Sequence, residues 1–590
     1  MLSINMDDVY KVIASIKNYL IILGIVLVVG IIVLIAAKKI QKPLRQLVRG
    51  NAGIAMLLAL LIILNLVLTG PMSTLLDLVS GGGQINEATS AEATALVSRI
   101  TEEGVVLAKN EDGILPVASG SKLNVFGWAS TNPCYGGTGS GALNTAYPTV
   151  DLLQGLADAG IETNAELSKF YTDYKADRPS VMMWQQDWTL PEPAAAAYSD
   201  ELIANAKAFS DTAMIVITRV GGEGADLPTD MTAVVEGSWA RRIATDGNYK
   251  GMGAGYFAGS YDDSLNAGND WDVGDHFLQL SNREEEMIDL VCANFDKVIL
   301  VYNGANAFEL GFVKDYPQIK GVLLCPGTGQ SGFGGFGSVV SGAVNPSGRT
   351  VDTYVSDMKA SPWWNNFGDY NYTNMDDYKS DATFFDPYGT IVNFVNYVEG
   401  IYVGYKYYET AYTESLLAAE AADIANAEAE AAAAEAAAKA AEAAEGEEVA
   451  EPAAPAEPVA VIEPSFVFDY DAEVVYPFGY GLSYTDFDVK MSDIDFDGTN
   501  LKFDVTVTNT GSVAGKDVVE IYFNPPYVNG GIEKASANLL EFAKTAELAA
   551  GASETVNFVI PVEQMASYDY LGEGCYVLDE GDYVISVNSD

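Results

Sequence analysis

Two long apolar runs open the chain, at about residues 19–37 and 53–68. Each is long enough to cross the hydrocarbon core of a membrane as a helix of roughly 20 residues, the second only just. The short segment between the runs is basic, with Lys38, Lys39, Lys42, Arg45 and Arg49. After the second run, the next lysine or arginine is Arg99. We therefore expect residues 1–70 to form a membrane anchor with two transmembrane helices.

The positive-inside rule also orients this anchor. It puts the basic segment in the cytoplasm and everything after about residue 70 outside the cell, although Lys11 and Lys17 oppose this assignment slightly. A cleaved signal peptide is the alternative, but the sequence has two apolar runs and no clear cleavage site of small residues. The expected location is the cell membrane, with the main body on the extracellular face.

Residues 71–413 have the pattern of an α/β domain. Near-continuous apolar runs typical of buried strands occur at residues 123–126, 213–220, 298–302 and 321–325. Helix-like segments lie between them, and one begins with a capping box at Ser281 and Glu284. This alternation predicts a mostly parallel sheet with helices on both faces. Ligands of such sheets bind beyond the carboxyl ends of the strands, so the segments that follow each strand are the place to look for a site.

A low-complexity insert interrupts this domain at residues 414–464. Its first part is almost entirely alanine and glutamate, which are strong helix formers, and its second part is rich in proline. We expect a solvated helix followed by an extended linker, with residues 465–483 returning to the α/β domain. A partner-binding coil is the alternative, but its apolar seam would consist of alanine alone.

The hydrophobic period changes to two in residues 484–590. Leu501, Phe503, Val505 and Val507 alternate with polar neighbours, and Asp-Gly and Asn-Gly pairs mark turns. This pattern predicts a small antiparallel β-sandwich.

Composition excludes several classes of function. The formal net charge is −49, a field that repels nucleic acid and fits a neutral substrate. There is a single histidine, and the four cysteines have neither metal-like nor redox-like spacing. We therefore expect free thiols, no metal site, no cofactor and no nucleic-acid partner.

The first strand-following segment to consider is the glycine-rich stretch from Gly127 to Gly141. Its later glycines suggest a dinucleotide-binding loop, but they lie about ten residues beyond the strand, whereas that fingerprint needs them at the strand end. A loop whose main chain approaches a sugar fits better, because glycine leaves room for close contact. The substrate-binding residues predicted here are Gly136, Gly137, Thr138 and Ser140.

Glu223 is the main candidate for chemistry. It lies between glycines just beyond the strand predicted at residues 213–220. A partly desolvated carboxyl group has a raised pKa and can act as a general acid near neutral pH. An ordinary acidic loop residue would give the same local pattern.

Four segments together resemble motifs of the family 3 glycoside hydrolases, the β-glucosidase group. They are EGVVLAKNE at 103–111, RVGGEGAD at 219–226, NPSGR at 345–349 and PFGYGLSYT at 477–485. The resemblance implies an (α/β)6-sandwich domain followed by a fibronectin type III-like domain. It also implies retaining hydrolysis of a β-glycoside, with Glu223 as acid/base and with Arg219 and Asp226 near the substrate.

The resemblance is incomplete, because the family's nucleophilic aspartate lies on a separate (β/α)8 barrel. Such a barrel needs roughly 250 residues. Once the anchor, the β-sandwich and the low-complexity insert are subtracted, the α/β domain already uses the rest of the chain. The order is similar to the front part of domain-permuted members, so a separate barrel chain is a possible partner. Asp187-Trp188 and Asp270-Trp271 are weakly similar to the nucleophile's surroundings, and we interpret both as chance. We expect this chain to be catalytically incomplete alone.

Two other functions remain open. A non-catalytic surface module that binds glycans would keep the sugar contacts without turnover. A nucleotide-dependent enzyme would bind its cofactor through residues 137–141.

Overall fold

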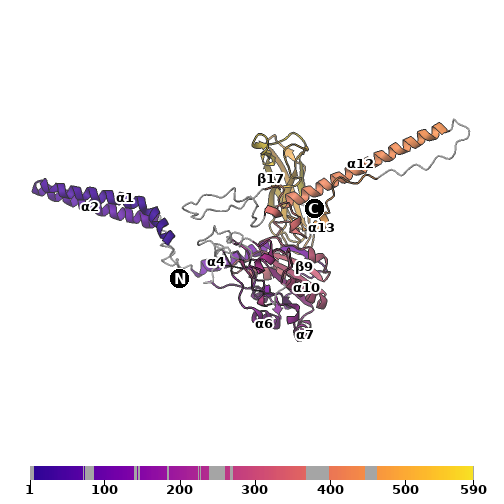
Figure 1. Cartoon of the computed structure of the whole chain (residues 1–590), viewed down its shortest axis with the longest axis horizontal. Helices are drawn as coiled ribbons and strands as arrows, with labels where there is room; N and C mark the ends of the chain where they lie inside the picture. The colour runs from indigo at the N-terminus through magenta and orange to yellow at the C-terminus, as the bar shows by residue number, and fades with distance from the viewer. Residues whose placement is uncertain are drawn as a thin grey trace. The chain divides into compact units, whose positions relative to one another are not determined.

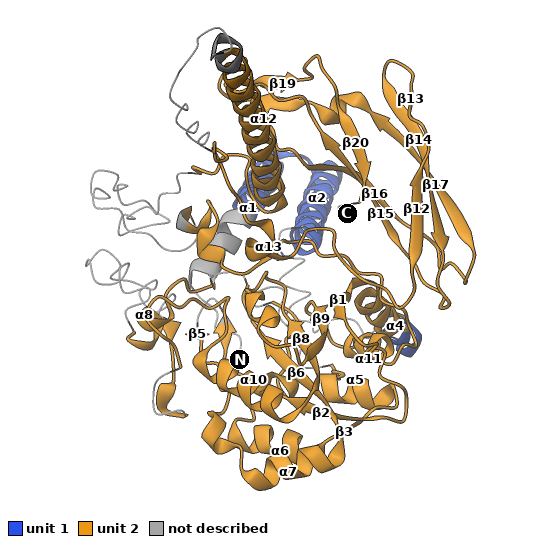
Figure 2. Cartoon of the chain, turned by 90° about the vertical axis from the view of Figure 1, so that its right-hand side faces the viewer, with its two compact units in different colours: residues 1–91 blue, residues 92–590 orange. Residues whose placement is uncertain are grey.

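The computed structural model describes residues 6–70, 72, 86–137, 143, 147–182, 185–222, 225, 227–237, 259–265, 270–366, 397–444 and 461–588. The chain divides into two compact units, residues 1–91 and 92–590 (Figure 2). The two units are described separately.

The first unit contains the two predicted apolar helices, α1 (Met6–Ala36) and α2 (Lys42–Thr69), joined by a short 3-10 turn. They lie side by side (Figure 1), and Gly30 is so close to α2 that a Cβ there would lie 2.4 Å from the Met56 sulfur. Most of their large apolar side chains are exposed. The stretches Ile16–Lys39 and Lys42–Thr69 are long and apolar enough to cross a membrane, by length and composition only.

The second unit is built on a sheet of six strands within the described residues, in the order β1-β9-β8-β6-β2-β3. Its four central strands are parallel and match the predicted runs: β2 (Lys122–Phe126), β6 (Thr212–Thr218), β8 (Lys297–Asn303) and β9 (Ile319–Cys325). The edges are β1 (Val106–Asn110), antiparallel to β9, and β3 (Glu162–Thr163), parallel to β2. The predicted, mostly parallel sheet is therefore confirmed.

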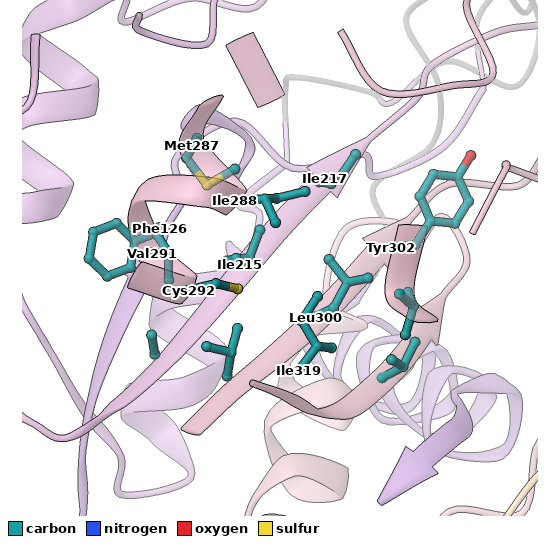
Figure 3. Packing of buried hydrophobic residues seen from close by; sticks show 14 of the residues in the cluster. Phe126, Ile215, Ile217, Met287, Ile288, Val291, Cys292, Leu300, Tyr302 and Ile319 are labelled. Carbon is teal, nitrogen blue, oxygen red and sulfur yellow. The ribbon is translucent and has the colours of Figure 1, made fainter. Parts of the chain in front are cut away.

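Helices cover both faces of this sheet, as predicted (Figure 2). Alternate residues of β6 belong to different cores: Ile215 and Ile217 to one, Met214 and Val216 to the other. The first core is covered by α6 (Ala165–Tyr174), α7 (Asp200–Phe209) and α10 (Asn282–Asn294). The second is covered by α5 (Leu152–Asp158) and α11 (Phe333–Val340). Figure 3 shows the apolar side chains of α10 facing those of β6.

Local sequence explains where α10 begins. Ser281 accepts a hydrogen bond from the Glu284 backbone, and the Glu284 carboxylate accepts one from the Ser281 backbone. This is the predicted capping box, which satisfies N–H groups that the first turn leaves free.

The predicted Ala/Glu-rich helix is present as α12 (Tyr405–Ala444) and is longer than expected at its start (Figure 1). Its first turns carry aromatic residues that pack onto the domain, with Tyr408 and Ala411 buried. The returning chain runs along it, because the Asn426 side chain makes two hydrogen bonds with the Ile462 backbone. After α13 (Tyr470–Glu473), the chain re-enters through β11 (Val474–Tyr476), which pairs with β10 (Tyr354–Val355). The proline-rich residues 445–460 lie outside the described residues.

The predicted β-sandwich is confirmed. One sheet contains β12 (Phe487–Met491), β13 (Asp495–Phe496), β14 (Asn500–Asn509) and β17 (Ser553–Pro561). The other contains β15 (Val518–Asn524), β16 (Asn538–Lys544) and β20 (Val584–Val587), and a separate hairpin is formed by β18 (Ser567–Asp569) and β19 (Cys575–Val577). The alternating apolar residues of β14 enter the core between the two sheets.

Three of the four motif segments recognised in the sequence meet where the α/β domain contacts the sandwich. Asn345 accepts hydrogen bonds from Ser483 and from the Tyr484 backbone and donates to Ala514, while Arg349 bonds to Gly481 and Asp517. Residue 107 forms a β-bridge with residue 482. These motifs therefore hold the two domains together, and the first of them also reaches the end of β9, where Gly104 lies beside Pro326.

Candidate active site

The loops that follow the four parallel strands meet at the carboxyl edge of the sheet through their glycines. A Cβ on Gly327, after β9, would lie 2.9 Å from the Gly136 Cα, and one on Gly137, after β2, would lie 3.4 Å from the Gly221 oxygen. A Cβ on Gly304, after β8, would lie 3.1 Å from the Arg219 oxygen. Main chain therefore packs closely on main chain where these loops meet, and at Gly327 a side chain would force its neighbours apart. The structure brings the predicted residue Gly137 beside the loop that follows β6, and the predicted residue Gly136 beside the loop that follows β9.

The loop after β6 turns back sharply. Gly222 and Ala225 form an antiparallel bridge, and the Ala225 N–H donates to the Gly222 oxygen at 3.0 Å. Ala225 is buried in an apolar cluster with Leu227, so the loop is fixed on both sides of residues 223 and 224. The predicted residues Glu223, Asp226, Thr138 and Ser140 lie outside the described residues.

Arg219 anchors the base of this loop. Its guanidinium makes a bidentate ion pair with Glu284, with Nη1–Oε1 and Nη2–Oε2 distances of 2.8 and 2.7 Å. The remaining N–H groups donate to the backbone oxygens of Phe277, Gln279 and Thr218. Because a guanidinium has five donors, none is left for a sugar. We interpret Arg219 as a positioning residue in place of the predicted substrate contact.

Asn303, the last residue of β8, ties neighbouring loops together. Its Oδ1 accepts from the Cys134 N–H at 2.6 Å, and its Nδ2 donates to the oxygens of Cys134, Cys325 and Pro326 at 3.1–3.3 Å. The side chain is fully buried. One amide group thus fixes the spacing of the segments after β2, β8 and β9.

Arg178 is a cation at this edge that sequence reasoning missed. Its Nη2 donates to the Thr218 hydroxyl at 2.8 Å and to the Asn132 oxygen, and its guanidinium lies 5.0 Å from the centroid of the Trp128 ring. Burial lowers the pKa of Arg178 to about 10. Its Nε is buried and has no hydrogen-bond partner among the described residues. No local pattern marks this residue, since it lies on a loop between α6 and β4 (Val181–Met182).

Glu192 is a second missed residue with an unusual environment. It is buried, and its carboxyl accepts hydrogen bonds from the Trp128 N–H and from the Tyr198 hydroxyl, each at 2.7 Å. Tyr198 contacts the Tyr171 hydroxyl, which accepts from the Gly127 N–H. Burial raises the pKa of Glu192 to about 8. Both oxygens are engaged within the protein, so this carboxyl group holds the loop after β2.

Three of the four residues in the two Asp-Trp pairs are buried within the domain. Trp188 and Trp271 are buried in the cluster that also contains Ala225. Asp270 is buried and bonded to Arg283 at 3.2 Å and to the Tyr261 hydroxyl at 2.8 Å. The cluster supports the loop after β6 from the side. It also includes α8 (Met231–Val235), and it adjoins a small sheet formed by β4, β5 (Gln185–Asp187) and β7 (Gly259–Ser260).

Comparison with known proteins identifies this arrangement. Residues 105–405 match the glycosyl hydrolase family 3 C-terminal domain, and residues 517–590 match a fibronectin type III-like domain. The chain belongs to glycoside hydrolase family 3. The order of the two matches agrees with the α/β domain and the sandwich described above, and the second match covers the sandwich from β15 onward. The family expected from the sequence motifs is therefore confirmed.

Two relatives of this family 3 chain are β-glucosidases. It is 29% identical over 504 residues to beta-glucosidase A of Butyrivibrio fibrisolvens, covering 82% of this chain and 48% of the relative. It is 25% identical over 500 residues to a beta-glucosidase of Ruminococcus albus, covering 84% and 39%. The chain thus spans about half the length, or less, of these relatives.

Solved structures show the same fold. A beta-glucosidase from Paenibacillus barengoltzii is 27% identical, with a TM-score of 0.56 and coverage of 84% of this chain and 42% of that one. Beta-glucosidase 3B from Thermotoga neapolitana, in complex with glucose, is 26% identical, with a TM-score of 0.56 and coverage of 85% and 52%.

Proposed function

We propose that this chain carries the acid/base part of a retaining β-glucosidase-type active site, with Glu223 as the acid/base. The observation that carries the proposal is the sharp turn closed by Gly222 and Ala225 at the carboxyl end of β6. Glu223 lies between these two residues in the sequence. The turn follows a buried strand, where ligands of parallel sheets bind.

In the proposed mechanism, Glu223 first donates its proton to the oxygen of the leaving group. A second carboxylate attacks the anomeric carbon from the opposite face, at a separation of about 5–5.5 Å between the two carboxyl groups. Glu223, now ionised, then takes a proton from the water that releases the sugar. Arg219 and Glu284 act at a distance by fixing the strand end from which the turn departs.

We propose that the attacking carboxylate lies on the (β/α)8 barrel of family 3 enzymes. The two family matches of this chain are to the C-terminal and fibronectin type III-like domains, and the chain spans about half of its relatives' length. The barrel would come from residues outside this sequence or from a separate chain. The substrate would be a β-glucoside, since the relatives are named β-glucosidases.

The remaining residues are assigned by position. Gly137 lies beside the turn, and Gly136 and Gly137 would offer main-chain groups to the sugar. Thr138 and Ser140 follow them closely in the sequence, and Asp226 directly follows the turn. The chemistry needs neither a metal nor a cofactor, because proton transfer and attack are both performed by carboxyl groups.

We also propose that α1 and α2 anchor the protein in the cell membrane, with the second unit on the extracellular face. Their exposed apolar surfaces support this, and so does the basic segment from Lys38 to Arg49 between them. An exposed apolar helix pair of this length is costly in water and stable in a bilayer.

The test is hydrolysis of aryl β-glucosides by the full chain in detergent, alone and with a family 3 barrel added in trans. Glu223→Gln is compared with Glu236→Gln, the same change at an exposed position of the same segment. Turnover that needs the barrel and disappears only in Glu223→Gln supports the proposal. Turnover by the chain alone would place both carboxylates within it, and unchanged turnover in Glu223→Gln would remove Glu223 from the mechanism. Sugar binding without turnover in either form would favour a glycan-binding module.

A further inference from the structure

A large pocket lies between the start of α12 and the β-sandwich, and none of its lining residues belongs to the loops after β2, β6, β8 and β9. Its volume is about 920 Å³. This is within the range of about 300–1,000 Å³ typical of sites for small ligands. The lining residues come from 398–417, from 524–536 and from two single positions, Pro362 and Phe466.

Hydrogen bonds across the pocket wall fix its shape. The Thr413 hydroxyl donates to the Ser536 hydroxyl at 3.0 Å, and the Ser536 N–H donates to the Thr410 hydroxyl at 3.0 Å. Opposite them, the Tyr402 hydroxyl donates to a Glu533 carboxylate oxygen at 2.6 Å. The first turns of α12 are thus bound to the segment between β15 and β16. These hydrogen bonds therefore hold the walls of the pocket in place.

The chemistry of the lining suits a sugar. The rings of Tyr402, Tyr407 and Tyr527 give apolar surfaces, while Glu414 and Asn529 supply polar groups. A pyranose ring has the matching combination, since its C–H groups can lie on an aromatic ring while its hydroxyls bond to carboxylates and amides. Tyr527, Glu414 and Asn529 are exposed, and none has a side-chain hydrogen bond to another described residue, so they can contact a ligand.

The acidic residues around the pocket exclude an anionic ligand and favour a neutral one. Glu399 and Glu414 line the pocket, and Glu533 adjoins it, so an anion would be repelled. The ammonium group of Lys534 does not offset them for a ligand, because it is buried and already bonded to the Pro526 oxygen and to Asp579. An organic cation would fit the charge but would leave the hydroxyl and amide groups of the lining without a partner.

We propose that this pocket is a second carbohydrate site, which binds a neutral oligosaccharide independently of hydrolysis. The choice of a β-linked glucose oligomer as its ligand rests on the proposed function. Two sites on one chain would hold a polymeric substrate by two points, which raises its effective concentration at the site of cleavage.

The experiment is calorimetric titration of the full chain with cellotetraose, in a detergent without a sugar headgroup. Tyr527→Ala and the more conservative Glu414→Gln alter the pocket, whereas Tyr576→Ala removes a more exposed tyrosine on β19. We expect Tyr527→Ala to weaken one class of binding at least tenfold, Glu414→Gln to weaken it severalfold and Tyr576→Ala to leave it unchanged. Thermal melting of each variant checks that the fold is retained.

Two results would overturn the proposal: cellotetraose affinity equal in all variants, or binding of benzyltrimethylammonium with no binding of cellotetraose. Aryl β-glucoside hydrolysis by the same variants, with the barrel present, separates this proposal from the preceding one. A pocket that binds sugar in a chain that never hydrolyses it would leave the second site intact and refute only the catalytic proposal.

Discussion

Replacing Glu284 by glutamine should destabilise the α/β domain far more than the same acid-to-amide change in an exposed ion pair. The carboxylate of Glu284 is the counter-charge of Arg219, whose side chain is completely buried. Glutamine keeps the size of the side chain but leaves a buried guanidinium without an opposite charge. The matched control is Asp211→Asn, which alters the exposed pair between Asp211 and Lys297.

The expected difference follows from burial, because the N–O distances are nearly equal. The Arg219–Glu284 pair spans 2.7 Å at 0% and 7% side-chain exposure, and the Lys297–Asp211 pair spans 2.8 Å at 57% and 75%. Removing one partner of a buried pair costs about 3–5 kcal/mol. An exposed pair contributes about 0–1 kcal/mol.

Thermal unfolding measured by tryptophan fluorescence tests this difference. At an unfolding entropy of about 2.1 cal/mol/K per residue, a domain of about 300 residues shifts by about 1.6 °C per kcal/mol, so Glu284→Gln should lower Tm by about 5–8 °C and Asp211→Asn by less than about 2 °C. The double variant Arg219→Met/Glu284→Gln should be less destabilised than the sum of its single changes, since no lone charge stays buried. Equal Tm values for Glu284→Gln and Asp211→Asn would refute the anchoring role of the ion pair.

Three further predictions concern packing and protonation. Burial keeps Glu192 protonated in the folded state up to about pH 8, whereas in the unfolded state it ionises near the ordinary glutamate pKa of 4.5. The free energy of unfolding should therefore fall as pH rises between these values, by at most about 1.4 kcal/mol per pH unit. Glu192→Gln should flatten the corresponding decline in Tm measured from pH 5 to 8, and parallel Tm curves for the two proteins would contradict the prediction. Gly155→Ala should cost about 1–3 kcal/mol in denaturant unfolding, because its Cβ would lie 2.0 Å from the Phe333 oxygen, and an unchanged midpoint would show that α5 and α11 separate freely. Asn303→Ala should cost at least about 1–3 kcal/mol, because it leaves the buried Cys134 N–H unpaired, and unaltered hydrogen-exchange protection of that N–H would contradict the prediction.

Much of the fold could be predicted because a strand that is buried on both faces of its sheet has a continuous apolar run in the sequence. The run at residues 213–220 is apolar at nearly every position, and β6 has buried residues on both faces. The alternation from Leu501 to Val507 likewise corresponds to one buried face of β14. The edge strands β1 and β3 were not predicted, although the buried apolar residues 105–108 mark β1; β3 has only two residues, too few to give a pattern.

The candidate site was predicted less completely, because several of its residues are defined by tertiary contacts. The glycines after β2 and β6 could be found, since the position after a buried strand is itself a signal. Arg178 and Glu192 lie on irregular segments, and only the folded chain brings them to the ends of β2 and β6. Arg219 shows the converse, because a motif residue beside the acid/base candidate points into the protein, where its partner is 65 positions further along the chain.

The central claim is that Glu223 is the acid/base of a retaining site, and azide rescue tests it most directly. Glu223→Ala should abolish the turnover of aryl β-glucosides, both where the chain is active alone and where it needs an added family 3 barrel. Azide should restore it, because a small anion can attack the glycosyl intermediate without general-base help. We predict β-glucosyl azide as the product, identified by NMR. Full activity in Glu223→Ala, or rescue that gives the α-anomer, would contradict the account.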